Sequence, residues 1–288
     1  MTSAKCVACG GSDISHHWDK VGVPQVKCQG CGLVFSFPPP DPALVLSRYS
    51  VDWFEKEYLP SYGIDPAAPS LDHLASRYSA ELDPVEPFRK TGKLLDVGAG
   101  AGLFLSQAKK KGWDVFGVEA SEYGPAWAKM NLGIDIFHGT LDRAPFPDNY
   151  FDVVMLQDTI EHVPNPAEVV GRIYQLLRVG GALSISTPNL NSIGRRILGK
   201  QWGLVSATEH LCLFSPSCLR SLLERSGFEV ESFRISHFVN IGLIHEDHTR
   251  STHYRRGIFK RLVRNIPGPI WGKLGMGDEL FVIAKKAA

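Results

Sequence analysis

The stretch LLDVGAGAG, residues 94–102, joins an apolar run to a glycine-rich turn. The run ends in Asp96, and Gly98, Gly100 and Gly102 follow it two residues apart. Glycine allows a positive φ and has no Cβ atom, so another molecule can approach the backbone closely. A helix that starts directly after the turn offers free N–H groups. The stretch therefore predicts a strand, a ligand-binding turn and a helix.

After this turn, short apolar runs alternate with helical patterns. We expect strands at residues 93–97, 114–119, 134–139, 151–157 and 182–187, and helices at residues 103–112, 122–133 and 166–181. This alternation is typical of an α/β fold with a doubly wound parallel sheet. Such sheets bind their ligands beyond the carboxyl ends of the central strands. The glycine turn is predicted to lie there.

A second acid points to a nucleoside ligand. Glu119 ends the second expected strand, 23 residues after Asp96. At that separation a carboxylate can accept hydrogen bonds from both hydroxyls of a ribose. The glycines follow a G-x-G-x-G pattern, whereas the dinucleotide fingerprint has its third glycine three residues after the second. The pattern favours an adenosine-type ligand.

These motifs and several later ones resemble the class I S-adenosylmethionine-dependent methyltransferases over residues 90–288. The resemblance is carried by LLDVGAGAGLFL, the acid Glu119, GTLDRAPFPDNYFDVVMLQDTIEHVPNP, LLRVGGALSISTPN, SGFEV and DELFVIA. It implies a mostly parallel, seven-stranded Rossmann-like sheet and S-adenosylmethionine as the cofactor. The cofactor-binding residues that it implies are Asp96, Gly98, Gly100, Gly102, Glu119, Thr140, Leu141, Asp142 and Gln157. Asp142 is explained equally well as an exposed acid at a helix start.

Two Cys-x-x-Cys turns, each followed by glycine, lie near the N-terminus. Their cysteines, the expected metal ligands, are Cys6, Cys9, Cys28 and Cys31. Two such turns supply four thiolates to a tetrahedral, structural Zn²⁺ in a zinc ribbon. A redox pair or an iron site is the alternative. The histidines at positions 16 and 17 are surplus to the ligand set, and Cys212 and Cys218 are expected to be buried apolar groups without a partner at ligand spacing.

The ribbon divides the chain into three expected parts. We predict a zinc ribbon at residues 1–40, a helical linker or cap at 41–90, and the methyltransferase domain at 91–288. In the cap, Tyr49 and Tyr62 are weak candidates for contacts with the substrate. The stretch CQGCGLVFSFPPP resembles the knuckle that precedes methyltransferase domains encoded with polysaccharide- and sugar-modifying enzymes. Sugar C-methyltransferases of that group carry a further C-terminal domain, which we expect this chain to lack.

Two histidines are candidate general bases. His162 follows the fourth expected strand, where side chains can reach the reaction centre, and an imidazole titrates near neutral pH. The alternative is that its turn caps the next helix and shields the cofactor. His210 is the rival, because the resemblance includes a similar His-Leu where loops line the acceptor pocket. His162 and His210 are alternative candidates for the general base.

Two insertions are expected to shape the acceptor site. Residues 189–210 form a long connection, which suggests a lid or binding loop. Its basic side chains beside Trp202, namely Arg195, Arg196 and Lys200, would receive an anionic or sugar-linked acceptor or form a solvated face. The second insertion spans residues 239–277. Its part at 251–277 is basic and apolar, so it would contact an anionic membrane surface or pack on the domain.

The bulk composition limits the classes of function. The chain of 288 residues has 31 Lys+Arg against 30 Asp+Glu, so no global field attracts nucleic acid. We find neither a signal peptide nor a membrane span and expect a cytoplasmic location. The expected activity is O-methylation of a sugar, glycan precursor or other small-molecule acceptor. The alternatives are an RNA or protein methyltransferase that docks through the ribbon, and a non-catalytic cofactor-binding scaffold; the oligomeric state is not indicated.

Overall fold

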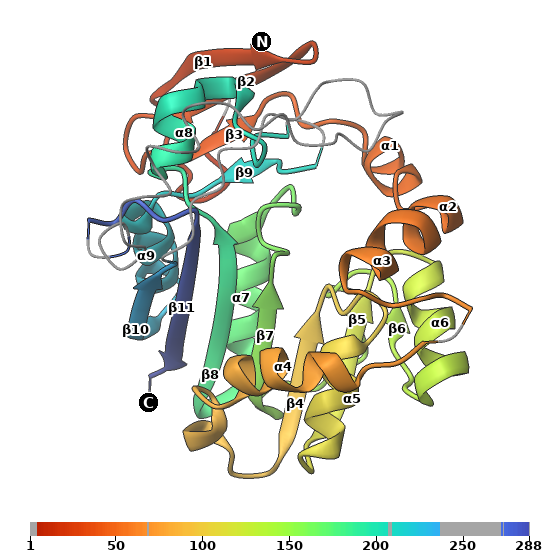
Figure 1. Cartoon of the computed structure of the whole chain (residues 1–288). Coiled ribbons are helices and arrows are strands. Elements are labelled where there is room, and N and C mark those ends of the chain that lie inside the picture. Colours follow the sequence, from red (N-terminus) through yellow and green to blue (C-terminus); the bar gives the residue numbers. More distant parts are fainter. Residues whose placement is uncertain (1–4, 68, 207–208, 237–271, 273, 288) are drawn as a thin grey trace.

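A computed structural model describes residues 5–287, apart from 68, 207–208, 237–271 and 273. A large sheet with helices on both faces lies below a small N-terminal sheet, and a group of short helices lies at the upper right (Figure 1). Within these described ranges, no helix combines the length and the hydropathy needed to cross a bilayer. Most of the second insertion, including residues 251–271 and 273 of its basic part, lies outside the described residues.

The large sheet has seven strands in the order β10-β11-β8-β7-β4-β5-β6. All run parallel except β11, which is antiparallel to both of its neighbours. The strands are β4 (Lys93–Val97), β5 (Asp114–Glu119), β6 (Phe137–His138), β7 (Phe151–Gln157), β8 (Leu177–Pro188), β10 (Phe228–Ile235) and β11 (Glu279–Lys286). This confirms the predicted α/β, doubly wound and mostly parallel fold. Because β11 is reversed, its first residues lie at the same edge as the carboxyl ends of β7 and β8.

Apolar side chains alternate along the central strands and cover both faces of this sheet. In β7, Val154 and Leu156 pack on the face of α7 and α9, whereas Val153 and Met155 pack on the face of α4, α5 and α6. A strand buried on both sides reads as a continuous apolar run, which is why β7 could be recognised in the sequence. The helices are α4 (Ala75–Leu82), α5 (Leu103–Lys110), α6 (Tyr123–Leu132), α7 (Pro166–Leu176) and α9 (Pro216–Arg225).

Two expected elements differ from the observed ones. The helix expected at 166–181 ends at Leu176, and Leu177 already belongs to β8, where it pairs with Phe151. Both leucines are fully buried. Residues 177–181, which the helical periodicity assigns to the helix, therefore belong to β8. The strand expected at 134–139 is reduced to the two residues of β6 at the sheet edge, because only β5 is available there to pair with it.

A buried carboxylate fixes the start of β4. Asp152, with no exposed surface, accepts hydrogen bonds from three successive N–H groups of residues 90–92, at 2.8, 2.6 and 2.6 Å, and pairs with Arg178. Burial raises the pKa of Asp152, but the Arg178 guanidinium and the backbone donors outweigh burial, so its pKa is lowered overall. This contact ties the chain entering β4 to β7 and β8.

The N-terminal ribbon is joined to the rest of the chain through a shared sheet. Its strands β1 (Ile14–Lys20), β2 (Val23–Cys28) and β3 (Val34–Ser36) are extended by β9 (Cys212–Leu213), which belongs to the far half of the chain. β9 pairs antiparallel with β3, as Val34 with Leu213 and Phe35 with Cys212. One apolar cluster contains Leu33 and Phe35 of the ribbon together with side chains of α7, α9 and the large sheet.

A helical cap connects the ribbon to the large sheet. It contains α1 (Pro42–Ser47), α2 (Val51–Trp53), the π-helical turn η1 (Phe54–Tyr58) and α3 (Leu59–Ser61), followed by the short turn η2 (Asp72–Leu74) before α4. Figure 1 shows these elements on the side of the large sheet where β5, β6 and α6 lie. Phe54 and Leu59 bury their side chains against α5 and α6, which holds the cap over the glycine turn.

Candidate active site

The glycine turn has the left-handed backbone that its residue types predict. Gly98, Gly100 and Gly102 have φ values of +78°, +51° and +68°. A Cβ on Gly98 would overlap Thr159, with Cγ2 only 2.8 Å away, and a Cβ on Gly100 would overlap the Tyr58 hydroxyl. Glycine is therefore required by both φ and space at these two positions.

Gly102 has a different role from the other two glycines. It does not line the main cavity in the described structure, and it begins α5 where a Cβ would lie 3.1 Å from Ile136 and 3.3 Å from Ala128. It permits α5 to pack closely against neighbouring elements, which is the part that a third glycine plays in such turns.

Glu119 lies at the end of β5 and points to the glycine turn. Its carboxylate accepts hydrogen bonds from the N–H groups of Gly100 at 2.9 Å and Ser121 at 2.7 Å. A carboxylate has about four acceptor positions, so Glu119 can still accept hydrogen bonds from the hydroxyls of a ribose. The two backbone donors hold the acid at the carboxyl edge of the sheet.

The glycine turn opens into a cavity of about 1030 Å³. Of the residues expected at the cofactor, the cavity is lined by Asp96, Gly98, Gly100, Glu119, Thr140, Leu141, Asp142 and Gln157. The structure thus brings together all of these except Gly102. Asp96 is buried, and burial, followed by the nearby Glu81 and Glu119, raises its pKa to about 8. A cation bound nearby would offset the cost of ionising this buried carboxyl group.

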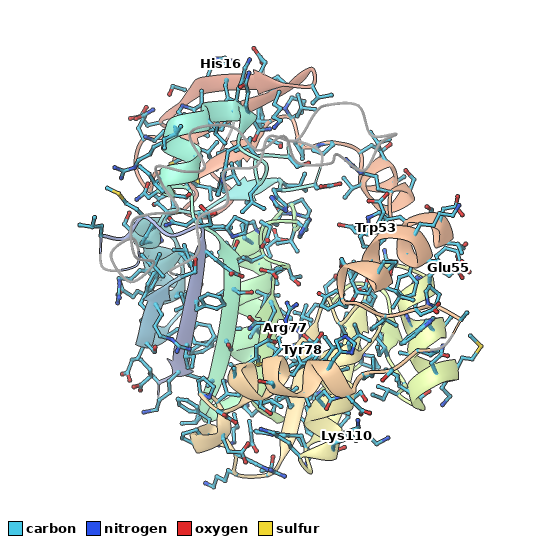
Figure 2. All side chains as sticks on the ribbon, in the orientation of Figure 1. His16, Trp53, Glu55, Arg77, Tyr78 and Lys110 are labelled. Carbon is cyan, nitrogen blue, oxygen red and sulfur yellow. The ribbon has the colours of Figure 1, made fainter. Side chains whose placement is uncertain are left out.

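Aromatic side chains of the cap form the opposite wall. Tyr49, Trp53, Tyr58 and Tyr62 line the cavity, and the Ala101 N–H donates to the Tyr58 hydroxyl at 3.3 Å. Figure 2 shows Trp53 on the inner side of the cap, whereas Glu55 points away from it. Tyr58 is the cap residue that touches the glycine turn, and sequence reasoning missed it because nothing distinguishes it from the neighbouring aromatic residues.

The cap and the loop before β9 meet across the mouth of this cavity. Arg48 forms an ion pair with Glu209 at 2.5 Å, and the Tyr49 hydroxyl lies 3.5 Å from His162 Nδ1. Arg77 and Tyr78 of α4 extend into the same cavity from below (Figure 2).

The two candidate bases lie side by side. The ring centroids of His162 and His210 are 4.8 Å apart with an interplanar angle of 76°. Burial, followed by the neighbouring His210, lowers the pKa of His162 to about 3, and burial also lowers the pKa of His210. Both imidazoles are therefore neutral at physiological pH. Only His162 lines the main cavity, and both line a smaller cavity of about 280 Å³ beside it, as far as the described residues go.

A pair of acids separates the two cavities. Asp158 has a positive φ of +46°, and its carboxylate accepts a hydrogen bond from the Ser186 hydroxyl at 2.9 Å. Glu279, the first residue of β11, lies beside it, and burial together with Asp158 raises the pKa of Glu279 to about 8. Sequence reasoning missed Glu279, because only the reversal of β11 brings it to this edge of the sheet.

The four predicted zinc ligands converge in the ribbon. The Sγ atoms of Cys6, Cys9, Cys28 and Cys31 all lie within 4.8 Å of one another, with two separations of 3.5 and 3.6 Å. Tetrahedral Zn–S bonds of about 2.3 Å place sulfurs about 3.8 Å apart, so the set fits a zinc ion. His16 is exposed and pairs with Asp19, as expected for a residue outside the ligand set.

The two remaining cysteines are buried, as expected, but Cys218 has a neighbour that the sequence did not indicate. Cys218 lies on α9, and its Sγ is 3.9 Å from the Sγ of Cys31 in the ribbon. Cys212 in β9 donates its N–H to the Glu161 carbonyl at 3.0 Å. The four-cysteine cluster and the loop that carries His162 are thus linked through β9.

The first insertion packs on the ribbon. Trp202 is fully buried beside ribbon and β9 side chains, and the Arg195 guanidinium lies 5.8 Å from the centroid of the Trp18 ring. Lys200 donates to a carbonyl of β1. Among the described residues that line the main cavity, neither these two cations nor Arg196 is found. Through α8 (Ile193–Leu198) and the turn η4 (Gly199–Gln201), the insertion connects the ribbon to the loop that ends in His210.

Comparisons with known proteins identify the family of this chain. The family described as "Methyltransferase domain" matches residues 70–232. The ubiquinone biosynthesis O-methyltransferase of Roseobacter denitrificans is 28% identical over 197 residues, which are 62% of this chain and 78% of that protein. The protein of the same name from Cereibacter sphaeroides strain KD131 is 28% identical over 211 residues, 66% of this chain and 83% of its own length.

Solved structures show the same fold at low sequence identity. A SAM-dependent methyltransferase from Archaeoglobus fulgidus has a TM-score of 0.54 and 22% identity, and covers 80% of this chain and 98% of its own. The cyclase SpnF has a TM-score of 0.58 and 17% identity, with 87% and 98% covered. The family match spans more than half of the chain and contains the glycine turn, Glu119 and the strands from β4 to β8. This chain belongs to the methyltransferase-domain family and is a class I S-adenosylmethionine-dependent methyltransferase.

Proposed function

We propose that this enzyme methylates a hydroxyl group of a small molecule, with a sugar or glycan precursor as the acceptor class. The observation that carries the proposal is the large cavity, which runs from the glycine turn to a wall of aromatic and acidic side chains. The names of the relatives support transfer to oxygen. Aromatic rings suit the faces of a sugar ring, and carboxylates suit its hydroxyls.

The cofactor half is assigned to the residues at the ends of β4, β5, β6 and β7. The bare glycine backbone accommodates the amino-acid tail, Glu119 accepts from the ribose hydroxyls, and Leu141 borders the adenine. When bound, S-adenosylmethionine supplies a methyl group on a positively charged sulfonium leaving group. Asp96 supports this assignment, because its buried carboxyl favours a cation nearby.

The acceptor half is assigned to the ends of β7, β8 and β11. Tyr49, Trp53 and Tyr62 enclose the acceptor, which excludes water and aligns its hydroxyl with the methyl group. Glu279 is the best-matched proton acceptor, since its pKa of about 8 is close to working pH. His162 and His210 remain candidates for handling that proton, but their lowered pKa values make each a weak base.

We assign a structural Zn²⁺ to the four ribbon cysteines. Four protein ligands leave no open position for a reaction at the metal. One edge of the ribbon sheet is paired with β9, and Arg225 of α9 donates to the Cys9 carbonyl at 3.0 Å. These contacts support a role in holding the acceptor loop rather than in docking RNA or protein.

The test is methyl transfer to fractionated small molecules. The enzyme is incubated with methyl-labelled cofactor and cell extract separated into sugar, sugar-nucleotide, phenol, RNA and protein fractions, and labelled products are identified by mass. We expect label in a sugar-containing fraction, at least tenfold less with Glu119→Gln at limiting cofactor, and normal transfer with the exposed ribbon variant His16→Ala. Label only in phenols would overturn the acceptor class, and label only in RNA or protein would overturn the small-molecule proposal. Elemental analysis showing no zinc in native protein would remove the ribbon assignment.

A further inference from the structure

Three side chains beside the acceptor cavity have the make-up of a metal site that is separate from the ribbon. Glu161, His162 and His210 each offer one ligand atom, and these atoms all lie within 4.8 Å of one another. Glu161 and His162 follow β7, and His210 precedes β9, so two loops contribute. The Glu161 carboxylate is buried, and the Thr187 hydroxyl donates to its Oε2 at 2.9 Å, which fixes its orientation.

Both imidazoles are held in the tautomer that a metal ligand needs. His162 Nδ1 lies 2.9 Å from the Glu209 carbonyl, and His210 Nδ1 lies 2.6 Å from the Leu204 carbonyl. A carbonyl oxygen only accepts, so each Nδ1 carries the hydrogen and each Nε2 keeps a lone pair. A histidine that donates one N–H to a backbone carbonyl while its other nitrogen faces a cation is the usual arrangement at metal sites.

The surroundings of these side chains also favour a cation. The smaller cavity is lined by the three candidate ligands together with Asp158, Asp278 and Glu279, and no Lys or Arg is among its described lining residues. Four carboxyl groups within one small cavity are costly to ionise together without a compensating positive charge. Asp158 and Glu279 also line the main cavity, so an ion here is within reach of the acceptor.

We propose that Glu161, His162 and His210 bind a divalent transition-metal ion, such as Mn²⁺ or Zn²⁺. Two imidazoles and one carboxylate suit these ions better than Ca²⁺ or Mg²⁺, which prefer all-oxygen ligands. His162 Nε2 and Glu161 Oε1 are 4.0 Å apart, whereas two ligands at about 2.1 Å from one tetrahedral ion are about 3.4 Å apart, so small side-chain rotations close the site. Three protein ligands leave positions open for an acceptor hydroxyl, a role that rests on the proposed function.

Manganese separates this site from the ribbon, because Mn²⁺ binds thiolates poorly. The full chain with its ribbon zinc is titrated with Mn²⁺, and free Mn²⁺ is followed by electron paramagnetic resonance. We expect one Mn²⁺ per chain, at least tenfold weaker binding in Glu161→Gln, and loss in His162→Ala/His210→Ala. His16→Ala should bind as the wild type does. Elemental analysis after saturation with Zn²⁺ should find two equivalents in the wild type and one in the double variant.

The outcomes distinguish this site from the proposed function. Binding of the demethylated cofactor, measured by calorimetry in each variant, reports an intact fold without requiring turnover, and Glu161→Gln keeps the side-chain shape if the double variant fails to fold. A wild-type chain that holds no Mn²⁺ and only the ribbon zinc overturns the site. Unchanged Mn²⁺ affinity in both Glu161→Gln and the histidine double variant also overturns it. Metal binding without any methyl transfer would retain the site and remove the proposed function instead.

Discussion

Replacing Gly98 by alanine tests the geometry of the cofactor turn most directly. Gly98 has a φ of +78°, and an alanine in this left-handed region costs about 1–2 kcal/mol. The new Cβ would also overlap Thr159, whose Cγ2 and Cβ would lie 2.8 and 3.2 Å away, and such overpacking costs about 1–3 kcal/mol. The free energy of unfolding should therefore fall by about 2–5 kcal/mol.

A matched glycine separates the two contributions. Gly133, which ends α6, has a φ of +62°, and a Cβ there would meet no atom within 4 Å. Gly133→Ala should therefore cost only the backbone part, about 1–2 kcal/mol. Both substitutions reduce the entropy of the unfolded chain equally, so their difference isolates the overlap with Thr159.

A double-mutant cycle assigns the overlap to its partner. Thr159→Ala removes the two side-chain atoms that would lie closest to the new Cβ, so Gly98→Ala/Thr159→Ala should recover about 1–3 kcal/mol relative to the sum of the single changes. Urea denaturation gives the free energies, and calorimetry with the demethylated cofactor gives the affinity. Strict additivity, or a Gly98→Ala variant no less stable than Gly133→Ala, would refute this account of the turn.

Three further predictions concern acids. Glu119→Gln should weaken binding of the demethylated cofactor at least tenfold in calorimetry, because a charge-assisted acceptor for the ribose is lost, and unchanged affinity would contradict its assignment. Asp152→Asn should lower the free energy of unfolding by about 3–5 kcal/mol at neutral pH, since Arg178 is left without its buried partner. The lowered pKa of Asp152 means that its contribution is present above the ordinary Asp pKa and is lost as pH falls through the folded value, so the two proteins should converge in stability in acid; parallel curves would argue against it. The pKa of Asp96 is raised to about 8, so the cofactor-free protein should lose stability as pH rises toward that value, and Asp96→Asn should lessen this loss in pH-dependent denaturation.

The features predicted from sequence are those encoded locally. The glycine turn, Glu119 and the cysteine pairs each depend on residues a few positions apart or on one strand-helix-strand unit, so spacing alone indicates them. Amphipathic helices and doubly buried strands also show in the sequence pattern, which is why the sheet was expected correctly.

The acceptor side could not be predicted in the same way, because it is assembled from distant segments. His162 and His210 looked like rivals in sequence, yet loop packing places their rings in contact. Glu279 reaches the site only because β11 runs antiparallel. The contact of Tyr58 with the glycine turn depends on how the cap folds back, which no local periodicity encodes.

The pairing of β3 with β9 has a consequence for the order of assembly. Residues 34–35 pair with β2 on one side and with residues 212–213 on the other, so the four-stranded sheet cannot be completed until most of the chain has left the ribosome. Long-range pairing of this kind slows folding, because a large loop must close before the contact forms. The four cysteines all lie within the first 31 residues and can therefore come together early, whereas the loop before β9 is fixed late, so the two halves of the enzyme mature at different times.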